Sequence, residues 1–339
     1  MKKVLFYASV SDLELFKIQS FYKYDIHCLE NIGFQVETTN RCFDFLKFWN
    51  YDASFLYFYR KSLLPAVISS FFRKKVVFTG GVDDLALDSS TKNFNIQRAL
   101  INFCYLFADS FLVVSDSDFL NIKKALFTSK LSKLILSYHS IDILQNFNPY
   151  REMSYQSRCC ISTICWMGSK VNVQRKGVDK ALYIFKEWLE KKPNLNIQKF
   201  YIIGRVGSGT DYLKEVIAEC GLDDYVEFTG AISDIEKNSL LLKSRFYFQC
   251  SQYEGFGVAA LEALYNGCLV IHSGNGGLSS TISSYGIQLT TLDVNSAVTE
   301  LIELDAGAHE VDYEAITAHL NKFFSHDIRS KSMKSSFNL

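Results

Sequence analysis

Short apolar runs alternate with amphipathic segments of helix length along this chain, and this alternation limits its possible folds more than any other feature. One series of runs reads VLFYA, FQVET, SFLYFY, KVVFT, SFLVVS and KLILS. A second series, after a polar stretch at residues 148–158, reads ISTICWM, KFYIIG, VEFTG, RFYFQ, CLVIH and GIQL. Strands that alternate with helices form parallel sheets with helices on both faces. The sequence therefore predicts an α/β protein with two doubly wound sheets.

The length and composition suit two domains. The chain has 339 residues, of which 48% are hydrophobic, and this is enough for two cores of ordinary size. We expect an N-terminal Rossmann-like domain over residues 1–147 and a C-terminal one over residues 158–320. Residues 321–339 would form a tail that packs back on the N-terminal domain. Because ligands bind beyond the carboxyl ends of parallel strands, the expected site is a cleft between two facing domains.

Charge and cysteine content limit the classes of partner. The 36 basic and 36 acidic side chains balance, so no nucleic-acid partner is expected. The nine cysteines form no Cys-x-x-Cys pair, which indicates reduced cytoplasmic thiols without a metal. Asp116-Ser117-Asp118 spells a metal-binding DxD motif, but Ser115 or Asp116 as the N-cap of a helix explains it more simply. No apolar stretch of about 18 residues is present, so we expect a cytoplasmic protein without a membrane span.

Two glutamates, Glu254 and Glu262, flank a Gly-Phe-Gly turn in the second half of the chain. A helix from Val258 onward would place Glu262 on its apolar face. A buried carboxylate is costly unless it is paired or hydrogen-bonded, and this favours a ligand contact over two solvated surface glutamates. At about 1.5 Å of rise per residue the two carboxylates would lie roughly 10 Å apart, which suits an extended ligand such as a nucleotide sugar.

Four segments of the second half follow one another in an order that is typical of one family: WMGSKVNVQRKGVDKAL, FYIIGRVGSG, VEFTGAIS and SQYEGFGVAALEALYNGCLVI. They resemble the retaining glycosyltransferases of family 4, which have the GT-B architecture of two facing Rossmann-like domains. The resemblance covers residues 160–285, and the first 140 residues match loosely. It implies that the domain of residues 1–147 lies on the acceptor side and that the domain of residues 158–320 binds the nucleotide sugar. It also implies that Glu254 contacts hydroxyls of the transferred sugar and Glu262 the ribose of the nucleotide. Backbone amides at a helix N-terminus would help to hold the diphosphate; they belong to Gly255, Phe256, Gly257 and Val258.

Basic residues at the start of the second domain would complete this site. Arg175 and Lys176 would neutralise charge on the leaving diphosphate, with Lys176 the stronger candidate. The family carries Gly-Arg directly after the preceding strand, whereas this chain has Gly168-Ser169-Lys170. Lys170 would supply charge there without the bidentate fork of an arginine. The second phosphate ligand is therefore either Lys170 or Arg175.

Glycine-rich turns would line the rest of the nucleotide pocket. Gly204 ends the strand KFYIIG, where a phosphate or a base could approach closely. By the same resemblance, Thr229 and Gly230 would flank the nucleobase. Backbone atoms near Gly276 and Gly277 would line the same pocket.

The first half offers acidic residues where many relatives carry a histidine. Asp83 and Asp84 follow the fourth predicted strand and would orient the acceptor or the sugar, or else only cap a loop. Residues 43–78 are rich in aromatic and basic side chains, Arg73, Lys74 and Lys75 among them. Such a segment suits peripheral contact with the inner face of the plasma membrane.

These features together predict a retaining hexosyltransferase that uses a nucleotide diphosphate sugar and needs no metal. The acceptor would be a carbohydrate or a lipid-linked oligosaccharide, as in the synthesis of a bacterial surface polysaccharide or lipopolysaccharide. By the resemblance, the donor phosphate itself would accept the proton of the acceptor. Two alternatives remain: a nucleotide-sugar 2-epimerase, which needs no acceptor, and a non-catalytic scaffold that binds a nucleotide sugar.

Overall fold

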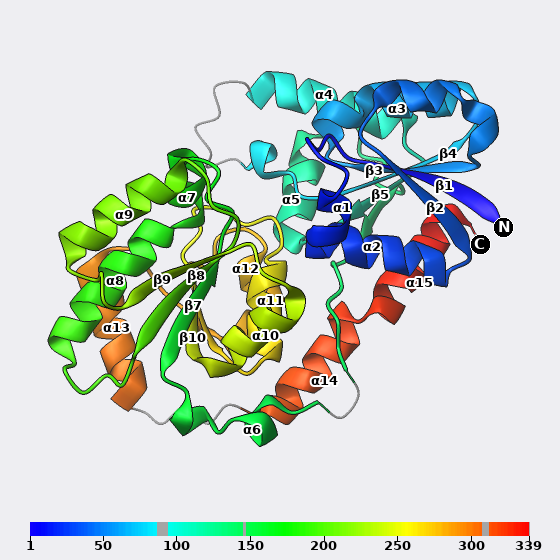
Figure 1. Cartoon of the computed structure of the whole chain (residues 1–339). Helices are drawn as coiled ribbons and strands as arrows, with labels where there is room; N and C mark the ends of the chain where they lie inside the picture. Colours follow the sequence, from blue (N-terminus) through cyan, green and yellow to red (C-terminus); the bar gives the residue numbers. More distant parts are fainter. Residues whose placement is uncertain (87–93, 145–146, 307–311, 339) are drawn as a thin grey trace. The chain divides into compact units, whose positions relative to one another are not determined.

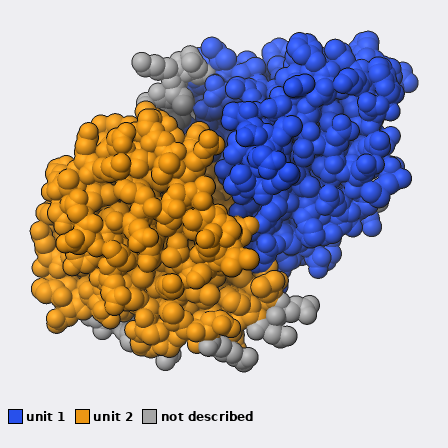
Figure 2. Space-filling view, in the orientation of Figure 1, with its two compact units in different colours: residues 1–142, 319–339 blue, residues 143–318 orange. Residues whose placement is uncertain are grey.

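The computed structural model describes residues 1–86, 94–144, 147–306 and 312–338. The chain divides into two compact units, shown as ribbons in Figure 1 and coloured separately in Figure 2. Unit 1 consists of residues 1–142 and 319–339, and unit 2 of residues 143–318. Each unit contains one parallel six-stranded sheet. The predicted α/β class with two doubly wound sheets is therefore confirmed.

Every apolar run of the sequence overlaps a strand. The sheet orders are β2-β1-β3-β4-β5-β6 and β12-β11-β10-β7-β8-β9. In each unit the chain first forms an inner strand, then adds strands on one side of it, and finally adds strands on its other side. The order therefore reverses between β1 and β3 in unit 1 and between β7 and β10 in unit 2. The strands are β1 Lys2–Tyr7, β2 Phe34–Thr39, β3 Ala53–Tyr57, β4 Lys75–Thr79, β5 Ser110–Val113, β6 Leu134–Leu136, β7 Cys160–Ile164, β8 Lys199–Ile203, β9 Val226–Gly230, β10 Ser244–Gln249, β11 Leu269–His272 and β12 Ile287–Gln288.

Helices cover both faces of the unit 1 sheet (Figure 1). Successive side chains of a strand point to opposite faces, so Leu5 joins the core under α3 and α4, whereas Val4 and Phe6 join the core under α2 and α15. Short 3-10 turns, labelled η, complete the unit. The elements are α1 Leu15–Ile18, α2 Ser20–Asn31, η1 Cys42–Leu46, η2 Phe48–Asn50, α3 Tyr59–Phe71, η3 Asp83–Leu85, α4 Phe94–Phe107, α5 Asp116–Ala125 and α15 His326–Phe337, with α14 Tyr313–Phe324 crossing the boundary between the units.

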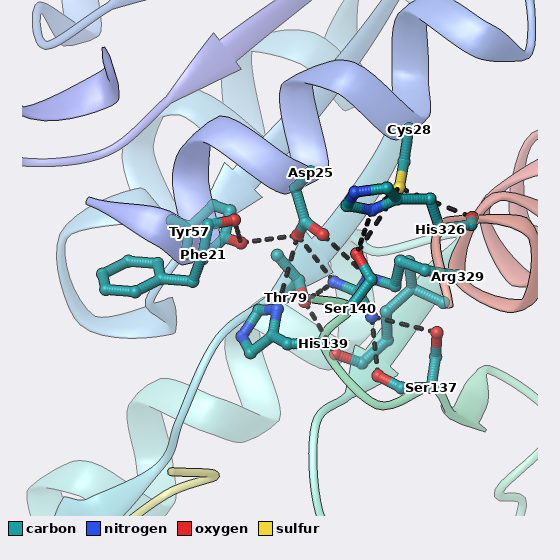
Figure 3. A network of polar contacts seen from close by, with 11 residues as sticks. Phe21, Asp25, Cys28, Tyr57, Thr79, Ser137, His139, Ser140, His326 and Arg329 are labelled. Carbon is teal, nitrogen blue, oxygen red and sulfur yellow. Dashed lines mark hydrogen bonds and ion pairs between the residues drawn. The ribbon is translucent and has the colours of Figure 1, made fainter. Parts of the chain in front are cut away.

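A buried ion pair joins α15 to α2 within unit 1 (Figure 3). Arg329 Nη2 lies 2.7 Å from Asp25 Oδ2, and both side chains are fully buried. Arg329 also donates hydrogen bonds to the Ser137 carbonyl and to Thr79 Oγ1. Burial alone would raise the pKa of Asp25, but Arg329 and His139 outweigh it and hold the pKa below its usual range. The carboxylate therefore stays charged, and its hydrogen bonds offset the cost of its burial.

Helices also cover both faces of the unit 2 sheet, with α8, α9 and α13 on one face and α10, α11 and α12 on the other (Figure 1). Helix α9 ends at Gly221, the C-cap residue, which lies in the left-handed region with φ 65°. The elements are α6 Pro149–Glu152, η4 Tyr155–Ser157, α7 Lys170–Lys176, α8 Val178–Lys191, α9 Gly209–Cys220, α10 Asp234–Lys243, α11 Val258–Tyr265, α12 Leu278–Thr281, η5 Ser283–Tyr285 and α13 Val294–Ala306.

Candidate functional site

Glu254 and Lys176 form an ion pair at the point where the strand order of unit 2 reverses. Glu254 follows β10, and Lys176 ends α7, the helix after β7. Parallel sheets bind ligands at this kind of position, beyond the carboxyl ends of the strands. Lys176 Nζ contacts Glu254 Oε2, and the two side chains remain 22% and 15% exposed. The pair is therefore held by the protein and still accessible to a ligand.

A chain of hydrogen bonds from β10 fixes the Glu254 carboxylate. Gln249 Nε2 and Ser251 Oγ donate to Glu254 Oε2 at 3.3 and 3.4 Å. Tyr247 OH in turn donates to Gln249 Oε1 at 2.9 Å, and burial raises the pKa of Tyr247, so its hydroxyl keeps its proton. These three residues were not predicted from the sequence. The sequence nevertheless contains a sign of them, because they are polar side chains at every second position at the end of a strand. This spacing places all three on one face of the sheet.

A glycine turn orients the first amides of α11 beside this pair. Gly257, the residue before the helix, has φ 98°, and a Cβ there would come within 2.8 Å of Leu278 Cδ2. The helix begins at Val258 as predicted. The loop after β11 lies against the same turn, because Gly277 N donates to the Glu254 carbonyl at 2.7 Å. The first amides of a helix lack intrahelical partners and carry partial positive charge, so they suit an anion.

Glu262 lies on the buried face of α11, as its spacing predicted, and is 7% exposed. Its Oε2 lies 2.9 Å from Nζ of Lys237, which also contacts Asp234 at 2.9 Å. Burial would lower the pKa of Lys237, but Glu262 and Asp234 outweigh it and the pKa lies above its usual value. This ion pair accounts for the buried charge of Glu262 without a ligand, so the ribose contact stays a prediction. Lys237 was not predicted from the sequence, where its spacing of three residues from Asp234 was a weak signal.

The other two basic residues have different surroundings. Arg175 donates hydrogen bonds to Asn172 Oδ1 at 3.1 Å and to the Tyr253 carbonyl at 3.4 Å. Lys170 begins α7, and its Nζ lies 4.2 Å from the centre of the Tyr212 ring in a cation–π contact. The structure thus brings Arg175 to the segment before Glu254, whereas Lys170 lies against α9.

Gly204 and the Thr229-Gly230 turn meet at the carboxyl ends of β8 and β9. Gly204 N donates to the Gly230 carbonyl at 3.1 Å. Gly204 has φ 140°, and a Cβ there would lie 2.2 Å from the Cys165 carbonyl oxygen. Thr229 Oγ1 also donates to the Gly230 carbonyl, at 3.0 Å. Both predicted turns therefore lie at the same edge of the sheet as Glu254 and are closely packed.

In unit 1, Asp83 and Asp84 form the short turn η3 after β4, and Asp84 pairs with Arg60 at 2.8 Å. The N-cap reading of the DxD sequence is confirmed, since Ser115 Oγ accepts a hydrogen bond from Asp118 N. Across the described residues, no group of three or more His, Cys, Asp or Glu side chains is arranged to hold a metal ion. Within the same residues, no helix is long and apolar enough to cross a bilayer.

Comparison with known sequences identifies the segment that carries this site. Residues 169–304 match the profile of the family described as Glycosyl transferases group 1. One subunit of the human phosphatidylinositol N-acetylglucosaminyltransferase is 31% identical over 124 residues, which cover 37% of this chain and 25% of the relative. The GDP-mannose:cellobiosyl-diphosphopolyprenol alpha-mannosyltransferase of Xanthomonas oryzae is 31% identical over 99 residues, or 29% of this chain and 25% of the relative. The alignments with these relatives thus span about a quarter of their length.

Solved structures match the whole chain in fold. HepE of Anabaena in complex with UDP and glucose aligns with a TM-score of 0.72 at 16% identity, over 100% of both chains. The sucrose-phosphate synthase of Thermosynechococcus elongatus aligns with a TM-score of 0.75 at 12% identity, over 100% of this chain and 98% of that one. These identities support the shared GT-B fold and no detail of the site.

Proposed function

We propose that this chain is a retaining glycosyltransferase that transfers a hexose from a nucleoside diphosphate sugar to a carbohydrate or lipid-linked oligosaccharide acceptor. The observation that carries the proposal is the partly exposed Lys176–Glu254 pair beside the N-terminus of α11, within the segment that matches the family profile. The Xanthomonas relative supports the donor and acceptor classes, because its name specifies GDP-mannose as the donor and a cellobiosyl unit linked to diphosphopolyprenol as the acceptor. The name of the human relative specifies transfer of N-acetylglucosamine to a lipid, phosphatidylinositol.

The two carboxylate oxygens of Glu254 have different surroundings. Lys176, Gln249 and Ser251 all contact Oε2, and no described residue forms a hydrogen bond with Oε1. Oε1 would accept a hydrogen bond from a hydroxyl of the transferred sugar. Lys176, Arg175 and the first amides of α11 would stabilise charge on the leaving diphosphate. The donor phosphate would take the proton of the acceptor, so the protein supplies positioning and positive charge, and no metal is required.

The cellular setting belongs to the same proposal. Synthesis of a surface polysaccharide or lipopolysaccharide would use a lipid-linked acceptor at the inner face of the plasma membrane. We propose that unit 1 contacts this membrane peripherally through η1, η2 and α3, whose exposed aromatic residues include Phe43, Trp49 and Phe71.

The first experiment measures melting temperature with UDP, GDP, ADP, CMP and TDP sugars, with and without EDTA. A ligand that binds only the folded state raises the melting temperature, so one nucleotide class should give a shift that EDTA does not change. Product analysis by NMR should then show that the anomeric configuration of the donor is retained. No shift with any nucleotide sugar would contradict the proposal.

The variant Glu254→Gln tests the role of the carboxylate. We expect turnover to fall by about 100-fold while affinity for the free nucleoside diphosphate changes little, because Glu254 would contact the sugar. Glu190→Gln, an exposed glutamate of α8, is the matched control and should behave as the unmodified protein. Equal turnover in both variants would remove Glu254 from the mechanism. An epimerised donor formed without acceptor would instead support the epimerase, and binding without turnover would support the scaffold.

A further inference from the structure

A polar cavity of about 450 Å³ lies at the carboxyl edge of the unit 1 sheet. It is lined by residues 11–13, which follow β1, by residues 38–41 at the end of β2, and by Asp44 of η1. The strands β1 and β2 are parallel, with Tyr7 opposite Thr39, so both loops leave the sheet at the same edge. Ligands of α/β proteins bind at this edge, and the volume falls within the roughly 300–1,000 Å³ of small-molecule sites.

Hydrogen bonds hold the wall of this cavity in one arrangement. Thr39 Oγ1 donates to Asp44 Oδ2 at 2.6 Å and accepts from Arg41 N at 3.0 Å. Asn40 Nδ2 donates to the Val10 carbonyl at 3.1 Å, which ties the loop after β2 to the loop after β1. The wall is therefore formed before any ligand arrives, and such preorganisation lowers the cost of binding.

Several polar groups of the lining have no partner within the described chain. The Arg41 guanidinium and the hydroxyls of Ser11 and Thr38 make no hydrogen bond or ion pair with a described residue. Asp12 uses only Oδ1, which accepts from Glu14 N at 3.0 Å, and Asn40 uses only its amide nitrogen. The lining thus offers a charged donor, carboxylate and amide acceptors, and hydroxyls that can do both.

The lining of the cavity carries charges of both signs, and this limits the classes of ligand that it can bind. A phosphate would meet the carboxylates of Asp12 and Asp44, and a cation would meet Arg41. A neutral molecule with several hydroxyls can satisfy donors and acceptors together, because each hydroxyl both donates and accepts. Leu13 also lines the cavity and is 46% exposed, which provides an apolar surface for the C–H face of a sugar ring.

We infer that this cavity binds a neutral sugar unit and that this unit belongs to the acceptor. The acceptor role rests on the proposed glycosyl transfer, whereas the binding of a neutral sugar rests on the cavity alone. The cavity thus assigns recognition of the acceptor to the ends of β1 and β2, apart from Asp83 and Asp84.

Saturation-transfer NMR on the full chain tests the inference with the methyl glycosides of glucose, mannose, galactose and N-acetylglucosamine as probes. At least one glycoside should bind, and its affinity should fall about ten-fold in both Arg41→Ala and Asp12→Ala, because each change removes a charged hydrogen-bonding group. Lys17→Ala removes an exposed lysine of α1 outside the cavity and should leave binding unchanged. Circular dichroism should show that all three variants fold, since these side chains are exposed.

Three outcomes would overturn the inference: no glycoside binds, binding is unchanged in both cavity variants, or inorganic phosphate displaces the glycoside. Melting temperatures with nucleotide sugars separate this result from the proposed function. If Arg41→Ala and Asp12→Ala lose glycoside binding but nucleotide sugars still raise their melting temperature, the result supports both the cavity and the proposed function. If the protein binds nucleotide sugars and turns them over, but the two cavity variants bind glycosides as the unmodified protein does, only the inference about the cavity is overturned. If glycosides bind but no nucleotide sugar changes the melting temperature, the acceptor role and the proposed glycosyl transfer are both overturned.

Discussion

At the scale of single residues, the two glutamates of the motif differ in how their charge is balanced. Glu254 pairs with Lys176 in a position that a ligand can reach. Glu262 pairs with Lys237 between α10 and α11, where both side chains are nearly excluded from solvent. The first pair can exchange contacts with a substrate, whereas the second can lose its lysine only at a cost in stability.

We therefore expect Lys237→Met to destabilise unit 2 by about 3 kcal/mol, because it leaves the Glu262 carboxylate buried without this lysine. Chemical denaturation gives the free energy of unfolding. The double variant Lys237→Met with Glu262→Met removes both charges and should recover most of this loss. A single variant as stable as the unmodified protein would show that the Glu262 charge is balanced by other groups or by solvent.

The same pair shows what the sequence could reveal about the site. The apolar spacing around Val258 predicted that Glu262 is buried, since helical periodicity is local. Lys237 lies 25 positions earlier on another helix, and no local pattern predicts a contact across that distance. Tyr247, Gln249 and Ser251 were missed for a related reason, because a hydrophobic strand hid their regular polar spacing. The two glutamates beside the glycine turn were therefore predictable from the sequence, but the residues that contact them were not.

At the scale of elements, α15 is fixed to unit 1 by polar contacts as well as by packing. His326 at its start lies 2.7 Å from Asp142 Oδ1 through Nε2 and 2.8 Å from Ser140 Oγ through Nδ1. Burial alone would lower the pKa of His326, but Asp142 and Cys28 outweigh it and raise the pKa from 6.5 to about 9. The imidazolium thus links α15 to the segment after β6.

This link should make the stability of unit 1 depend on pH. The folded pKa exceeds the unfolded value, so the contribution is fully present below pH 6.5 and is lost as the pH rises through about 9. His326→Gln should cost about 2 kcal/mol near pH 6 and little near pH 10, by urea denaturation at both values. Lys331→Gln, which removes an exposed positive charge from the same helix, is the matched control. An equal cost of His326→Gln at both pH values would contradict the charged link.

Strands and α15 differ in how well the sequence predicted them. The strands were found because each is a compact apolar run between polar segments. The segment HDIRSKSMKSSF of α15 is polar, and the sequence predicted only that it belongs to a tail that packs back on the N-terminal domain. Nevertheless Arg329, Ser330 and Met333 are buried, and Arg329 reaches Asp25 in α2 (Figure 3). Its burial depends on partners far away in the sequence, and these determine whether a polar helix can lie in a core.

At the scale of the whole molecule, a net charge of zero is compatible with a local surface of aromatic and basic residues. In unit 1, α3 packs against η1, and the two elements with η2 expose Phe43, Trp49 and Phe71. Arg73 and Lys74 lie just after the end of α3. Aromatic residues beside basic ones suit the interface of an anionic bilayer, where rings enter the headgroup region and cations meet lipid phosphates.

We expect the protein to sediment with phosphatidylglycerol liposomes and to bind less to phosphatidylcholine liposomes. The double variant Trp49→Ser with Phe71→Ser should lower the partition coefficient by about ten-fold or more, because both rings lose apolar contact with the bilayer. Ile235→Ser removes a comparably exposed apolar side chain from α10 in unit 2 and should change little. Binding should also weaken at high salt, since screening reduces the electrostatic part. If the unmodified protein fails to sediment, or if both variants bind equally, the acceptor must reach the enzyme without this surface.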